Sequence, residues 1–141
     1  MNRYELWDFL DDRAKNVILQ WVKDDRLTKR DCAVLNQKIS RLAQEDFDLA
    51  IKTKLLAGPI YKHVYKMRMK GAVQLRPMLC RGPISNESEY TFLLGAVETG
   101  GQLPPGSKEK AENHRALVLD DANRRTIHKR IPWGAERGVS G

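Results

Sequence analysis

The spacing of apolar residues predicts a strand and two amphipathic helices in the first third of the chain. Residues 3–10 mix aromatic and charged side chains, as a partly exposed strand does. Apolar residues then recur at helical spacing over 13–23, and again from Thr28 to about Gln44. Thr28 and Asp31, three residues apart, resemble a capping box at the start of the second helix. The pattern therefore predicts a helical hairpin.

The rest of the chain predicts three strands and one more helix. Alternation over 60–70 and 73–80 indicates two paired strands, and the nearly all-apolar segment 90–97 is typical of a central strand buried on both faces. We expect a polar helix over 107–123 and, after a folded domain spanning 1–125, a mobile basic tail over 126–141. This order predicts an α+β fold, in which the helical hairpin covers one face of a small antiparallel sheet and the other face stays open.

The first strand of the predicted pair has one apolar and one basic face, because successive side chains of a strand point to opposite sides. Its odd positions are Tyr, His and Met. Its even positions include the cations Lys62, Lys66, Arg68 and Lys70. With a three-residue loop between the strands, Lys66 falls opposite Arg76 on the basic face.

The charge of the chain concentrates on the same pair of strands. The net charge is +7, and no acidic residue stands between Asp48 and Glu87. The cations of that stretch are Lys52, Lys54, Lys62, Lys66, Arg68, Lys70, Arg76 and Arg81. Lys and Arg neutralise phosphates, and RNA carries its own nucleophile in the 2′-hydroxyl, so such a surface could bind RNA and cleave it without a metal ion. The residues leave open a second interpretation, a solvated strand face that discourages edge pairing.

Other classes of chemistry find no support in the sequence. The two cysteines and three histidines lack the spacing of metal ligands. No segment approaches the ~20 apolar residues of a membrane span, and the N-terminus lacks the apolar core of a signal peptide. We therefore expect a cytoplasmic protein that does not enter membranes and uses no cofactor or metal.

Four segments carry a resemblance to a known family. They are GPIYKHVYKMRMKG (58–71), VQLRPMLCRGP (73–83), YTFLLGAVE (90–98) and KEKAENHR (108–115). In these segments and in the order of its elements, the chain resembles the RelE/ParE toxin superfamily, specifically its HigB-like, phage-derived branch, over roughly residues 1–125. The resemblance implies a RelE-like fold and a toxin neutralised by an antitoxin, often a helix-turn-helix protein. Many members are ribosome-dependent endoribonucleases that cut mRNA and so inhibit translation.

The resemblance also implies roles for individual residues. Lys66 becomes the candidate general base, while Arg68 and Arg76 would hold or stabilise the phosphate. Glu98 stands where active relatives commonly carry Lys, Arg, His or Tyr; it could act as a base, but it replaces a cation. Further RNA contacts are expected from Lys62, Lys70, Arg81 and His128, with plain solvation left open for His128.

Three functions remain open at this point. The first is an endoribonuclease toxin, which the basic residues favour. The second is a non-enzymatic ParE-like toxin that inhibits a protein such as DNA gyrase. The third is an inactive member that binds only its antitoxin or nucleic acid. Glu98 favours the second and the third.

Overall fold

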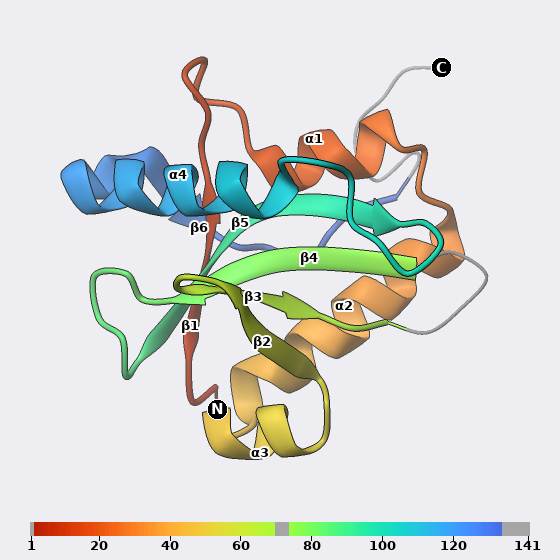
Figure 1. The fold of residues 1–141 in the computed structure, drawn as a ribbon, viewed down its shortest axis with the longest axis horizontal. Helices are drawn as coiled ribbons and strands as arrows, with labels where there is room; N and C mark the ends of the chain where they lie inside the picture. The colour runs from red at the N-terminus through yellow and green to blue at the C-terminus, as the bar shows by residue number, and fades with distance from the viewer. Residues whose placement is uncertain (1, 70–73, 134–141) are drawn as a thin grey trace.

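The computed structural model describes residues 2–69 and 74–133, and within them the chain forms an α+β fold (Figure 1). The helices are α1 (Val17–Asp24), α2 (Lys29–Gln44), α3 (Phe47–Lys52) and α4 (Ser107–Asp120). The strands are β1 (Glu5–Phe9), β2 (Leu56–Tyr61), β3 (Val64–Met67), β4 (Gln74–Arg81), β5 (Glu89–Glu98) and β6 (Arg125–Ile127). They form one sheet in the order β2-β3-β4-β5-β1-β6, in which β1 and β5 are parallel and the other neighbours antiparallel.

Side-chain caps set where the first two helices begin. The predicted capping box is confirmed, because Thr28 and Asp31 bond to each other's backbone N–H groups at the start of α2. Helix α1 begins later than the apolar spacing predicts. Asn16 caps it by accepting from the N–H groups of Ile18 and Leu19, and Ala14 before it has a positive φ of 58°.

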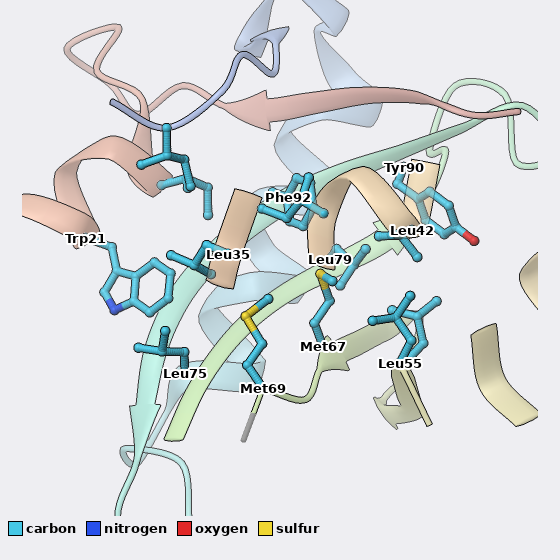
Figure 2. Packing of buried hydrophobic residues seen from close by; sticks show 14 of the residues in the cluster. Trp21, Leu35, Leu42, Leu55, Met67, Met69, Leu75, Leu79, Tyr90 and Phe92 are labelled. Atoms are coloured by element: carbon cyan, nitrogen blue, oxygen red, sulfur yellow. The ribbon is translucent and has the colours of Figure 1, made fainter. Parts of the chain in front are cut away.

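The main core lies between the sheet and helices α1 and α2 (Figure 2). Leu35 and Leu42 of α2 are fully buried against sheet residues that include Leu79 and Phe92. Burying a side chain of this kind stabilises the fold by roughly 1.5–3 kcal/mol. Trp21 of α1 packs so closely over β5 that a Cβ atom on Gly95 would lie 2.0 Å from its ring.

The second face of the sheet is covered by α4, so the expectation of an open face is wrong. A smaller cluster there joins Ala111 of α4 to Val64, Met78, Cys80 and Leu93 of the sheet. The physical reason lies in β5, which was correctly predicted as apolar on both faces. A strand of that kind needs a packing layer on each side, and the hairpin can supply only one.

The segment expected to form one strand over 60–70 forms a hairpin instead. Lys62, in a left-handed conformation with φ 48°, turns the chain from β2 into β3. Lys66 then lies opposite Met78, not opposite Arg76 as expected. Residues 70–73, which include the predicted turn and Lys70, lie outside the described residues.

The expected mobile tail over 126–141 is packed as far as the structure describes it. Strand β6 pairs with β1, and Ile131 is buried in the main core. The Asn36 side chain of α2 accepts from the N–H of Ile131 and donates to its carbonyl. These contacts fasten a segment whose charged composition suggested mobility. Residues 134–141 lie outside the described residues.

Candidate functional site

Three of the predicted site residues meet at one end of the sheet. The Lys66 ammonium donates to the carboxylate of Glu98 at 2.6 Å, and Nε of Arg76 lies 3.2 Å from the other oxygen of that carboxylate. The Arg76 contact lacks hydrogen-bond geometry and is therefore an ion pair. The side chains of Glu98 and Arg76 are 9% and 5% exposed, and that of Lys66 is 20% exposed. Two cations around one carboxylate leave a net positive charge at this site.

The sheet register brings these side chains to the same face. Arg76 of β4 lies opposite Ala96 of β5, and Glu98, which pairs with Gln74, is two residues beyond Ala96. Because side chains repeat a face every second residue, Arg76 and Glu98 share one face. Lys66 joins them through its pairing with Met78, two residues from Arg76. The site therefore lies on the α4 side of the sheet, beside the residues that α4 covers.

Arg76 is held in place by backbone carbonyls as well as by Glu98. Its Nη1 donates to the carbonyls of Met69 at 3.2 Å and Leu75 at 2.9 Å. Its Nη2 donates to Oε1 of Gln74 at 2.8 Å. A buried guanidinium needs such partners to offset its lost hydration. Arg76 thus has a fixed orientation before any ligand arrives.

Glu98 is the ionised group of this site. The hydrogen bond from Lys66, aided by the nearby charge of Arg76, lowers the pKa of Glu98 in spite of its burial. Glu98 is therefore a carboxylate at neutral pH and can accept a proton. Lys66 is a hydrogen-bond donor in this arrangement, which suits a cation or a proton donor better than the role of base.

Arg68 is near this cluster but takes no part in its ion pairs. Its side chain is exposed, and within the described residues it has no ion-pair partner. It lines, together with Arg76, a pocket of about 610 Å³ between α2 and the start of β4. Arg68 is therefore a cation that a ligand can reach.

Of the further predicted RNA contacts, Lys70 lies outside the described residues, and the structure places the other three away from Lys66. Lys62 lies in the β2–β3 turn, with its ammonium 5.4 Å from the Tyr61 ring. Arg81 is at the far end of β4 and stacks over Phe47 at 4.1 Å. His128 lies near the other edge of the sheet, with a side chain that is 6% exposed and bonded to Asp8 at 2.9 Å. These residues do not join Lys66, Arg76 and Glu98, which we call the Lys66 cluster. The contacts of Arg81 and His128 are structural.

Sequence reasoning missed Lys38 and Arg41, and it counted Lys54 in the acid-free stretch without placing it beside Arg68 and Arg76. Lys38 and Arg41 of α2 and Lys54 after α3 line the same pocket as Arg68 and Arg76. Two signals could have indicated them. Lys54 belongs to the acid-free stretch of the sequence, and Lys38 and Arg41 are three residues apart, which places them on one side of a helix.

Comparison with known proteins gives no relative from which a function could be inferred. No family model, curated protein or solved structure matches this sequence. In the ranges that the structure describes, His, Cys, Asp and Glu side chains form no group of three or more that could hold a metal ion. The helices seen there are too short or too polar to cross a bilayer.

Proposed function

We propose that this protein binds RNA at the Lys66–Arg76–Glu98 site and cleaves it as the toxin of a toxin–antitoxin pair, acting on mRNA at the ribosome. The RelE/ParE resemblance suggests this class and also a cognate antitoxin as the protein partner. One observation carries the proposal. A fixed arginine and a lysine share one carboxylate on the same sheet face, next to the accessible Arg68.

The chemistry of the proposed reaction follows from the charges of the site. The 2′-oxygen of RNA attacks the adjacent phosphorus, the bond to the 5′-oxygen breaks, and a 2′,3′-cyclic phosphate and a 5′-hydroxyl result. Arg76 and Arg68 stabilise the charge that develops on the phosphate oxygens. The phosphate replaces Glu98 as the partner of the cations, which frees the carboxylate to accept the 2′-proton. Lys66 is placed to protonate the leaving oxygen.

A second candidate is a toxin that binds its target without cleaving RNA, such as a ParE-like inhibitor of DNA gyrase. The observation that favours it is the pairing of Glu98 with both cations. If Glu98 stays paired with Lys66 and Arg76 when a phosphate approaches, its charge cancels part of theirs, and the carboxylate is not free to accept the 2′-proton. The two candidates differ in what Glu98 does, and this difference can be tested.

The test is induced expression in cells, followed by pulse labelling of new protein and mapping of mRNA 5′ ends. We expect prompt arrest of protein synthesis with cleaved mRNA. Arg68→Ala should lower cleavage roughly 10²-fold through lost charge stabilisation. Glu98→Gln should lower it about 10²- to 10⁴-fold by removing the proton acceptor. Lys129→Gln removes an exposed lysine near the β6 edge and should cleave as the wild type does.

Each alternative has its own signature in this experiment. DNA damage without mRNA cleavage would replace the nuclease with the gyrase inhibitor. Full cleavage by Glu98→Gln would remove Glu98 from the reaction. Arg68 is the cation of choice for substitution because it is exposed, whereas loss of the buried Arg76 would also disturb the fold.

A further inference from the structure

A second basic feature adjoins the Lys66 cluster, and Arg76 belongs to both. This is the pocket of about 610 Å³ that α2, the turn before β2 and the start of β4 enclose. Its described lining contains five cations and no carboxylate. The cations are Lys38, Arg41, Lys54, Arg68 and Arg76. We call it the basic pocket.

The basic pocket retains most of its charge. Arg41 and Arg76 have carboxylate partners, Glu45 and Glu98, that lie outside the lining. In the described part of the chain, no ion pair neutralises Lys38, Lys54 or Arg68. Like charges held together without a counter-charge repel one another, so an anion between them would relieve that repulsion.

Two of the cations are held in position by their surroundings. Arg41 donates to Glu45 at 2.8 Å and to the hydroxyl of Thr53 at 3.1 Å, which points its guanidinium across the pocket wall. Arg76 is fixed by its backbone partners on the opposite side. A guanidinium held in this way loses little conformational freedom when it binds an anion.

Lys54 occupies a position where glycine is the usual residue. It follows the C-terminus of α3 with φ 64°, and its N–H bonds back to the carbonyl of Ile51 at 3.1 Å. Helices commonly end with glycine in this left-handed conformation. The lysine thus brings a cation to the pocket at a small conformational cost. Residues in such sparsely populated backbone conformations are often found at binding sites.

We propose that the basic pocket binds a phosphate group, namely a backbone phosphate of the RNA strand whose neighbouring phosphate lies at the Lys66 cluster. The phosphate specificity rests on Lys38, Arg41 and Lys54, the three lining cations that the proposed reaction does not use, and on the guanidinium geometry, which suits phosphate oxygens. The choice of RNA as its source rests on the proposed function. Arg76 links the two places, because it lines the pocket and contacts Glu98.

The experiment measures binding of fluorescein-labelled decauridylate by fluorescence anisotropy at several KCl concentrations. The test variant combines Lys38→Gln with Lys54→Gly, and the matched control is Lys129→Gln. The glycine suits the left-handed backbone, so the test variant should keep the thermal midpoint of the wild type. At low salt we expect it to bind roughly ten- to a hundredfold more weakly, with a salt slope smaller by about 1.4, since each lost phosphate contact on a single strand removes ~0.7. The control should match the wild type.

A second arm replaces the RNA with inorganic pyrophosphate, followed by calorimetry. Pyrophosphate binding that the test variant weakens, while decauridylate binding is unchanged, would keep the phosphate site but assign it to a small phosphorylated ligand. Unchanged binding of both probes by the folded test variant would overturn the pocket. If Lys66→Gln, a change at the Glu98 site and outside the pocket lining, still weakened RNA binding in that case, the proposed function would survive without the pocket. A wild-type chain that binds pyrophosphate but no RNA would overturn the proposed function instead.

Discussion

Strand β5 begins with Glu89 and finishes with Glu98, and both carboxylates form buried ion pairs that differ in their partners. Glu89 forms a bidentate pair with Arg125, at 2.6 Å and 3.2 Å, and also accepts from the N–H groups of Ile84 and Ser85. Glu98 accepts from Lys66 and lies against Arg76. Both carboxylates are more than nine-tenths buried.

The difference lies in how the charge is balanced. Arg125 and Glu89 neutralise each other, are 6% and 7% exposed, and tie the β4–β5 loop to β6. This one-to-one pair, which we call the closed pair, has no uncompensated charge that could bind a ligand. Glu98 is shared by Lys66 and Arg76, and Lys66 remains partly exposed. Arg68, which has no ion-pair partner among the described residues, lines a pocket together with Arg76. A site with an excess of positive charge at the surface can exchange its carboxylate for a phosphate.

The largest effect is expected from breaking the closed pair. Glu89→Ala leaves Arg125 as a buried charge without compensation, which costs about 3–5 kcal/mol of stability. Urea unfolding monitored by circular dichroism measures this loss. Glu87→Ala, an exposed neighbour in the same loop, should stay within ~0.5 kcal/mol of the wild type. A small loss in Glu89→Ala would mean that the pair does not hold the loop to β6.

The second prediction concerns the shared carboxylate. Glu98→Gln should cost less stability, about 1–2 kcal/mol, because the amide oxygen still accepts from Lys66 and the site is closer to solvent. It should also strengthen RNA binding at low salt and steepen the salt slope by about 0.7 for each cation set free. Anisotropy with decauridylate measures both quantities. Weaker binding by the variant would contradict the view that Glu98 competes with phosphate.

The smallest effect is a pH dependence that belongs to Glu98. Its pKa is lowered in the folded state, so the stability it contributes is present above its ordinary value of 4.5 and is lost as pH falls through the lowered pKa. Urea unfolding of the wild type and Glu98→Gln from pH 7 to pH 3 should therefore show a stability difference that shrinks only at the acidic end. A difference that is constant with pH would show that the ion pairs of Glu98 contribute no stability.

The strengths and failures of sequence reasoning can be traced to single residues. Thr28 and Asp31 are three residues apart, so the start of α2 could be predicted from local chemistry. The alternation around Lys66 correctly separated it from Met67, which faces the main core. The partner of Lys66 could not be predicted, because Glu98 is 32 residues away and meets it only through two strand registers.

The amino-acid sequence by itself determined the α+β class, the double-sided burial of β5 and the concentration of cations in the acid-free stretch between Asp48 and Glu87. These follow from periodicity and composition, which act over a few neighbouring residues. Only the tertiary structure decided that α4 covers the second face, that Lys62 turns the chain, and that α2 contributes to the basic pocket. The partners of the charged residues on the sheet depend in addition on strand register, which is irregular between Met78 and Leu79. A shift of one residue exchanges the two faces of a strand, so the position of every charge on the sheet depends on contacts between distant parts of the chain.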